Sequence, residues 1–206
     1  MYNNKKQNPS NDTIWFQIDN KSDIVNVTFY YETMCPYCRR YFVETLSPTW
    51  IQLKDHMKLL LVPYGNAQTK EVNGTTVFVC PHGPKECHGN IIHGCTNFLA
   101  SKNLTMRFLL ELHKINDKFD DDDSCGKTLN EDRLAYNILL CANSNIGVEI
   151  LKLYGKDTKA ANIQEIPTIS LNESIKNQDD IQKDLFEKIC KLLNKPPEIC
   201  NKVLNK

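Results

Sequence analysis

The sequence predicts an α/β domain in which a block of helices interrupts a β-sheet. Three observations lead to this class. Residues 25–31 are almost all β-branched or aromatic, and they run directly into a Cys-Pro-Tyr-Cys segment that begins a helix. Helical spacing of apolar residues dominates roughly residues 91–160. Strand composition then returns at residues 166–171. This order is typical of a sheet with a helical insertion.

The remaining elements follow from local patterns. Residues 36–46 predict a helix with proline in its first turn, which Pro48 ends or kinks. Further strands are expected at 58–62 and 75–79, helices at 104–115, 131–142 and 147–154, and a closing amphipathic helix at 181–193. Residues 1–23 are polar and predict a loosely held N-terminal arm, so that residues 24–206 form the domain.

Charge and hydropathy exclude several functional classes. The 25 basic and 25 acidic side chains cancel, so nothing favours nucleic acid or an anionic membrane as a partner. The longest apolar run, residues 59–62, is far too short to span a bilayer. No hydrophobic signal segment follows Met1, so we expect either a cytosolic chain or one that begins after a removed signal. No Gly-x-Gly-x-x-Gly fingerprint is present, and no cofactor is expected.

The nine cysteines indicate an oxidising compartment. Outside the pair Cys35 and Cys38 they form short-range groups, as structural disulfides do in secreted proteins. We expect the bridges Cys125–Cys141 and Cys190–Cys200, and a third bridge between two of Cys80, Cys87 and Cys95. Sequons at Asn11, Asn26, Asn73, Asn103 and Asn172 support the secretory pathway, although Asn26 falls in a predicted strand and is the poorest acceptor.

The pair Cys35 and Cys38 predicts redox chemistry. A Cys-x-x-Cys at a helix start places the first sulfur against unpaired backbone N–H groups and the positive end of the helix dipole, which favour its thiolate. The second sulfur lies one turn further on, where it can attack a mixed disulfide. Pro36 fixes the helix start and Tyr37 covers the ring. The alternatives are a structural bridge or half of a zinc site.

Ile166 and Pro167 precede the last predicted strand, where thioredoxin-like folds carry a cis-proline that faces the cysteine pair. We therefore predict a cis bond at Pro167, close to Cys35, and substrate positioning by Pro36, Tyr37, Ile166 and Pro167. The alternative is that Pro167 merely begins a strand.

Residues 80–95, CPHGPKECHGNIIHGC, carry the most distinctive pattern. They closely resemble the signature of the gamma-interferon-inducible lysosomal thiol reductase (GILT) family, with Pro81 in place of the family's glutamine. Residues 25–31, 47–50 and 61–67, the late proline and the pair Cys190 and Cys200 resemble the family too, so the similarity covers roughly residues 24–200. A family cysteine near His113 is absent, which leaves one of Cys80, Cys87 and Cys95 unpaired on this reading.

The resemblance implies a thioredoxin-like domain with a helical insertion that reduces protein disulfides through Cys35 and Cys38. It implies an endolysosomal or extracellular location, disulfide-bonded protein substrates, and electrons from a small thiol or a partner reductase. Two other functions remain open: an oxidase or isomerase of the DsbA type, and a secreted binding protein that retains the fold.

The histidines of the same segment make metal binding an alternative function for it. His82, His88 and His93 lie among three cysteines, a chemistry that suits zinc or copper, but disulfide formation would consume the thiolates. We expect no metal there, and a structural hydrogen bond rather than proton transfer for His82. The acidic run at 120–123 is interpreted as solvated charge rather than a calcium site.

Overall fold

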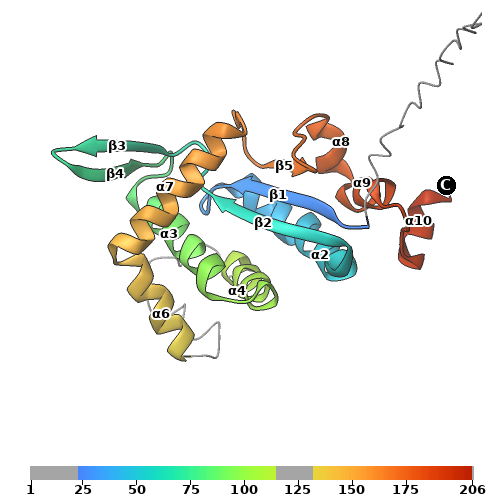
Figure 1. Ribbon diagram of the computed structural model, residues 1–206, viewed down its shortest axis with the longest axis horizontal. Helices are drawn as coiled ribbons and strands as arrows, with labels where there is room; N and C mark the ends of the chain where they lie inside the picture. The colour runs from blue at the N-terminus through green and yellow to red at the C-terminus, as the bar shows by residue number, and fades with distance from the viewer. Residues whose placement is uncertain (1–22, 115–131, 206) are drawn as a thin grey trace, which may run out of the picture.

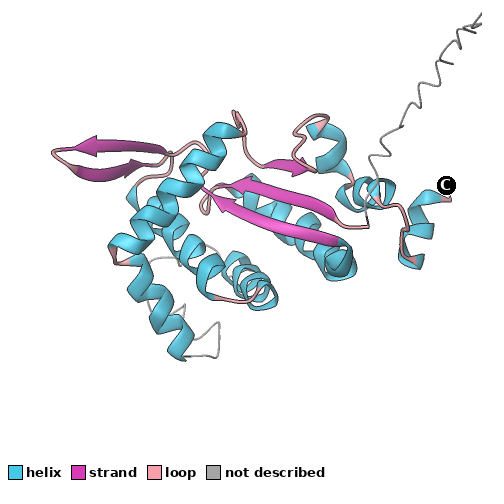
Figure 2. Ribbon diagram, in the orientation of Figure 1, coloured by secondary structure: helices cyan, strands magenta, loops and turns pink. Residues whose placement is uncertain are grey.

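The computed structural model describes residues 23–114 and 132–205. Its first strand begins a β–helix–β unit, and within the described residues a hairpin and a group of long helices separate that unit from the last strand (Figures 1 and 2). The strands are β1 (Val25–Tyr31), β2 (Met57–Pro63), β3 (Gln68–Val72), β4 (Thr75–Val79) and β5 (Thr168–Leu171). The α-helices are α1 (Pro36–Tyr41), α2 (Ser47–Leu53), α3 (Pro84–Leu99), α4 (Lys102–Lys114), α6 (Asp132–Ala142), α7 (Asn145–Ala160), α8 (Gln178–Lys183), α9 (Leu185–Leu192) and α10 (Asn201–Leu204).

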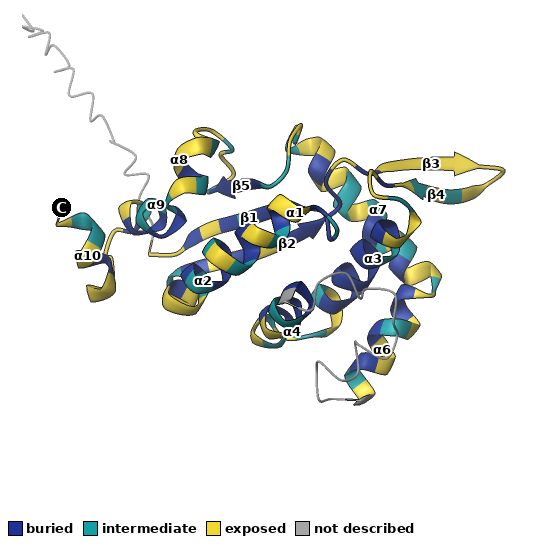
Figure 3. Cartoon of the chain, turned by 180° about the vertical axis from the view of Figure 1, so that it is seen from behind, coloured by how far each residue is buried: buried dark blue, intermediate teal, exposed yellow. Residues whose placement is uncertain are grey.

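A three-stranded sheet in the order β2-β1-β5 forms the centre of the fold. β1 runs parallel to β2, with Val25 opposite Met57, and antiparallel to β5, with Thr28 opposite Ser170. Alternate side chains of β1 are fully buried, and every residue of β5 is buried, because helices cover the sheet (Figure 3). The central strand therefore ends inside the protein, and the residues that follow Tyr31 begin in a largely water-free environment.

The expected strand at residues 75–79 exists, but it does not extend the central sheet. β4 pairs with β3 in a separate antiparallel hairpin, which projects from one end of the molecule (Figure 1). β3 is exposed throughout and polar except for Val72, so its sequence has no buried face to predict it. The turn between the strands is Asn73-Gly74, and both residues have positive φ values (51° and 76°), as the tight turns of hairpins require.

Two predicted helix boundaries are wrong. The helical insertion begins at Pro84, not near residue 91, because Gly83, with φ 91°, turns the chain into α3 and Pro84 starts its first turn. The expected closing helix at 181–193 is broken into α8 and α9. Asp184 has non-helical dihedral angles, and its carboxylate accepts a hydrogen bond from the Glu187 N–H at 2.8 Å, so it caps α9.

The helix at 36–46 does not end at Pro48. It continues through a π-helical turn, Phe42–Leu46, into α2, and Pro48 lies in the first turn of α2. Proline lacks the N–H that a continuous helix would use at this position, and a π-helical turn directly precedes it. Pro48 therefore marks a change of helix geometry, as the kinked alternative predicts.

Candidate active site at Cys35 and Cys38

Cys35 is the N-cap of α1, directly beyond the buried strand β1. Its φ and ψ, −66° and 117°, are extended, and Pro36 follows in the first turn. The Cys38 N–H donates to Cys35 Sγ at 3.3 Å, so the first sulfur is held by the start of the helix. Both side chains are buried and neither forms a disulfide. This is the arrangement of strand, cysteine pair and helix that the sequence predicts.

The pKa values of the two cysteines are shifted in opposite directions. A hydrogen bond from the Cys38 thiol is the main cause that lowers the pKa of Cys35 to about 6, with help from the N–H groups of Cys38 and Tyr37 and from His82, against the effect of burial. Burial raises the pKa of Cys38 far above its usual range, and the neighbouring Cys35 raises it further. Near neutral pH the pair therefore holds one thiolate, on Cys35, and one thiol, on Cys38.

The loop at Pro167 lies beside the active-site helix. The Ile166–Pro167 bond is cis, as the sequence predicts. Ile166 and Pro167 line a hollow of about 450 Å³ together with Tyr37 and Tyr41. The Tyr37 ring is 67% exposed, and the Arg40 guanidinium lies 5.8 Å from its centroid. Pro36 lines a separate hollow of about 290 Å³, together with Arg39, Val43 and His113. Three of the four predicted positioning residues are thus brought together.

Helix α3 holds Thr33, which lies between β1 and Cys35, and Tyr31 at the end of β1. The Thr33 N–H and hydroxyl both donate to Asn90 Oδ1, at 3.0 and 2.9 Å. Tyr31 and His93 meet through a buried hydrogen bond of 2.9 Å between the phenol oxygen and Nδ1. Gly89 allows α3 to lie close to Thr33, because a Cβ at this position would be 2.8 Å from Thr33 Oγ1. The signature segment therefore supports the loop that carries Cys35.

A cluster of two buried carboxyl groups and one histidine lies beside the cysteine pair, and the sequence does not predict it. His82 Nδ1 shares a hydrogen bond of 2.6 Å with Glu86 Oε2 and lies 3.6 Å from Glu32 Oε2. Glu32 and Glu86 are buried, whereas the His82 side chain is 41% exposed. The backbone N–H of His82 also donates to Glu86 Oε1. The expected structural hydrogen bond of His82 is present, and Glu32 is the unexpected third member.

The disulfides correct two predictions. The described residues contain Cys80–Cys87, Cys95–Cys141 and Cys190–Cys200. Cys190–Cys200 is as predicted, but Cys141 pairs with Cys95 and not with Cys125, which lies outside the described residues. Cys80, Cys87 and Cys95 are all paired, so none of these three is the odd cysteine. The error arose because α3 and α6 pack together, which the short-range grouping of cysteines does not reveal.

The sequons lie in several different environments. Asn73 and Asn103 are exposed, at the hairpin turn and at the start of α4. Asn172 is half-buried, and its Oδ1 accepts a hydrogen bond from the Asn26 N–H at 2.9 Å. Asn11 lies outside the described residues. Glycosylation at these sites stays a prediction.

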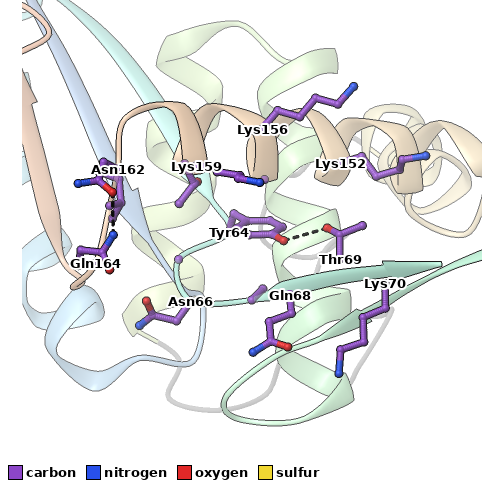
Figure 4. A pocket seen from close by; sticks show the side chains of 15 residues that line it. Tyr64, Asn66, Gln68, Thr69, Lys70, Lys152, Lys156, Lys159, Asn162 and Gln164 are labelled. Atoms are coloured by element: carbon purple, nitrogen blue, oxygen red, sulfur yellow. Dashed lines mark hydrogen bonds between the residues drawn. The ribbon is translucent and has the colours of Figure 1, made fainter. Parts of the chain in front are cut away.

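A lysine-rich hollow of about 810 Å³ lies between α7 and the first residues of the β3–β4 hairpin. Figure 4 shows the lysines of α7 on one side of Tyr64 and Lys70 on the other. Tyr64 is buried, and its hydroxyl lies 2.8 Å from Thr69 Oγ1. Lys152 pairs with Glu149 and Glu71, at 3.0 and 3.7 Å. The hollow adjoins the active-site region through Asn66, whose N–H donates to Glu32 Oε1 at 2.6 Å.

Residues 26–129 match the family model described as Gamma interferon inducible lysosomal thiol reductase (GILT). The chain is also 33% identical over 190 residues to the gamma-interferon-inducible lysosomal thiol reductase of Carassius auratus, an alignment that covers 88% of this chain and 74% of the relative. The chain belongs to this family. GILT-like protein 1 of Drosophila melanogaster is 32% identical over 196 residues, which cover 86% of this chain and 78% of that protein.

Solved structures that resemble this GILT-family chain include disulfide oxidoreductases of the thioredoxin-like fold. BdbD from Bacillus subtilis has a TM-score of 0.62 at 14% identity and covers 86% of this chain and 95% of its own. Reduced DsbG from Mycobacterium tuberculosis has a TM-score of 0.57 at 18% identity, with 88% and 85% covered. The predicted thioredoxin-like fold with a helical insertion is thereby confirmed, and family membership makes the protein a thiol–disulfide oxidoreductase.

No single helix within residues 23–114 and 132–205 is long and apolar enough to cross a membrane, although the bent pair Arg133–Ala142 and Asn145–Ala160 passes the same test of length and composition.

Proposed function

We propose that this protein reduces disulfide bonds in protein substrates through Cys35 and Cys38. The observation that carries the proposal is the acidity difference between the two sulfurs at the start of α1. The Cys35 thiolate attacks one substrate sulfur, and the other substrate sulfur leaves as a thiolate. Cys38 then attacks Cys35 Sγ, which releases the second substrate thiol and leaves a Cys35–Cys38 disulfide. A small thiol or a partner reductase restores the dithiol.

The hollow beside Tyr37 and Pro167 supports the placement of an extended substrate segment. The Pro167 carbonyl accepts a hydrogen bond from Gln182 Nε2 at 2.8 Å, so this carbonyl is already occupied. We propose that the backbone of Ile166 pairs with the substrate chain in the manner of strand addition. The substrate disulfide would then lie in line with the Cys35 sulfur.

We also propose that the protein works in an oxidising compartment. Three disulfides in the described residues favour an oxidising environment, such as the secretory pathway, an endolysosomal compartment or the cell surface. The names of the relatives from Carassius auratus and Mus musculus include the word lysosomal. Both observations support synthesis through the secretory pathway.

A trapping experiment tests the function. Purified Cys38→Ser protein, incubated with a disulfide-bonded protein, should accumulate a mixed disulfide that thiol reagents release. Cys35→Ser should trap nothing and should not reduce the substrate. Because relatives in fold include DsbA-type enzymes, the wild-type protein should be assayed in both directions, with a reduced and an oxidised client. Faster oxidation of the reduced client than reduction of the oxidised one would contradict the proposal and favour a DsbA-like oxidase.

A further inference from the structure

We propose that Glu32, His82 and Glu86 form a proton store that supplies protons to the two substrate thiolates released during reduction. The inference rests on the proposed reductase function and assigns roles to three side chains within it. His82 is the group that delivers the proton, and the two buried carboxyl groups hold it.

The geometry of the cluster carries this assignment. His82 Nδ1 shares a hydrogen bond with Glu86 Oε2, and Glu32 Oε2 is 3.6 Å from the same nitrogen. The other carboxylate oxygens are occupied, since Glu86 Oε1 accepts from the His82 N–H and Glu32 Oε1 accepts from the Asn66 N–H. The ring contacts the carboxyl groups through Nδ1, and the His82 side chain is 41% exposed. The ring thus links two buried carboxyl groups to the surface.

The cluster also lies close to both sulfurs. Glu32 precedes Cys35 by three residues, and its backbone hydrogen-bonds the Cys38 sulfur. His82 is near enough to favour the Cys35 thiolate electrostatically. The titratable groups that face Glu32 are Cys35 and Cys38 from the start of α1, and His82 and Glu86 from the α3 side.

Burial raises the pKa of Glu32 to about 7; the Asn66 N–H opposes this shift, and Glu86 and the Cys35 thiolate reinforce it. Below about pH 7 Glu32 therefore holds a proton, while the pKa of Cys35, about 6, lets its sulfur lose one. Between about pH 6 and pH 7 the site therefore contains both a Cys35 thiolate and a protonated Glu32.

The proton and electron balance closes within the site. At the start, Cys35 is a thiolate, Cys38 is a thiol and the cluster holds one proton. Attack by Cys35 breaks the substrate S–S bond and joins one substrate sulfur to Cys35. The leaving thiolate takes the proton from His82 Nε2, while Nδ1 takes the proton that the carboxyl groups hold. The Cys38 proton then moves to the cluster as Cys38 attacks Cys35, and from there to the second leaving thiolate. Two electrons and two protons pass to the substrate, which becomes two thiols.

Leaving groups of different basicity provide the test. Alkyl thiolates are strong bases and need a proton to leave, whereas aryl thiolates leave readily without one. The wild-type protein, Glu32→Gln and His82→Asn are compared on a symmetrical alkyl disulfide and on an aryl disulfide. Asparagine at 82 keeps an N–H donor in the place of Nδ1 but cannot relay a proton. Glu149→Gln, an exposed side chain on α7, is the surface control.

We expect both active-site variants to lose about 10²-fold in kcat on the alkyl disulfide, the lower end of the range for general acid catalysis. On the aryl disulfide they should remain within about threefold of wild type. The wild-type rate should also fall as the pH rises through about 7, where Glu32 loses its proton, and Glu32→Gln should lack this fall. Thiolate absorbance should show that each variant still forms the Cys35 thiolate.

Equal losses on both disulfides would indicate a structural role and overturn the inference, as would no loss on either. If the wild-type protein reduces neither disulfide, the proposed reductase function itself fails, and this outcome is distinguishable from the other two.

Discussion

The Cys38 N–H points at Cys35 Sγ across 3.3 Å, so the thiolate of one redox cysteine is bound by the backbone of the other. This contact exists only because Cys35 is the N-cap residue and not a residue inside the helix. A cysteine in this position uses an N–H group that a helix would otherwise leave without a partner. The reactive sulfur is therefore selected by its place in the helix.

Selective alkylation should reveal this difference between the two cysteines. In the reduced protein, the rate of Cys35 alkylation should rise with pH around a midpoint near 6, since the thiolate is the nucleophile. Cys38 should stay unmodified across the same range, because burial holds its proton. Mass spectrometry of peptides after timed quenching measures both rates. Modification of Cys38 first, or a Cys35 midpoint near that of a free cysteine, would contradict the assignment.

The bridge Cys95–Cys141 should be the disulfide with the largest effect on stability outside the redox pair. It spans 46 residues, against 7 for Cys80–Cys87 and 10 for Cys190–Cys200. In the chain-entropy account, closing a loop of this length contributes about 4 kcal/mol, compared with about 2.5 kcal/mol for the shortest. The paired substitution Cys95→Ser with Cys141→Ser should lower the free energy of unfolding more than Cys80→Ser with Cys87→Ser.

Chemical denaturation measures these free energies, and peptide mapping under non-reducing conditions identifies the bridges. A peptide that links Cys125 to Cys141 would contradict the structure and restore the pairing that cysteine spacing alone predicts.

The sequence predicted the parts of the site that depend on neighbouring residues. A strand that runs into a proline-initiated helix places Cys35 and Cys38 without any tertiary information, and the signature at 80–95 identified the family. Glu32 was missed because its partner His82 is 50 residues away, and nothing in a single sequence brings the two together. The pairing of Cys95 with Cys141 was missed for the same reason. Of the β3–β4 hairpin only β4 was predicted, because only β4 has a strand-like composition.

Gly65 and Gly74 offer a matched test of how Glu32 is held. Both have positive φ, 55° and 76°, so alanine strains the backbone at either position. Only at Gly65 would the added Cβ overlap the Glu32 side chain, with Oε1 at 2.6 Å; at Gly74 no heavy atom lies within 4 Å. We expect Gly74→Ala to cost about 1 kcal/mol of stability and to leave activity unchanged.

Gly65→Ala should cost more, because overpacking typically adds about 1–3 kcal/mol. It should also change the pH dependence of reduction, since Glu32 must move. Denaturation curves and pH–rate profiles of both variants provide the comparison. If the two variants behave alike in both measurements, contact with Gly65 does not position Glu32.

His113 should make the fold sensitive to acid. Its side chain is buried against Phe42, with ring centroids 4.6 Å apart, and neither ring nitrogen has a hydrogen-bond partner among the described residues. Burial, with a contribution from the Arg39 charge, lowers the pKa of His113 to about 3 from an ordinary 6.5. In the unfolded chain the imidazole binds a proton below about pH 6.5, whereas in the folded protein it stays neutral until about pH 3.

The unfolded state therefore binds more protons between these two pH values, and the free energy of unfolding falls as the pH falls through this window. At pH 5 this single group should reduce stability by about 2 kcal/mol relative to neutral pH. His113→Leu replaces the ring with an apolar side chain of similar size and removes this titration. Denaturation midpoints of both proteins, measured from about pH 7.5 to pH 4.5, should diverge as the pH falls, with the variant losing less. Parallel curves would show that His113 is already protonated, or solvated, in the folded protein.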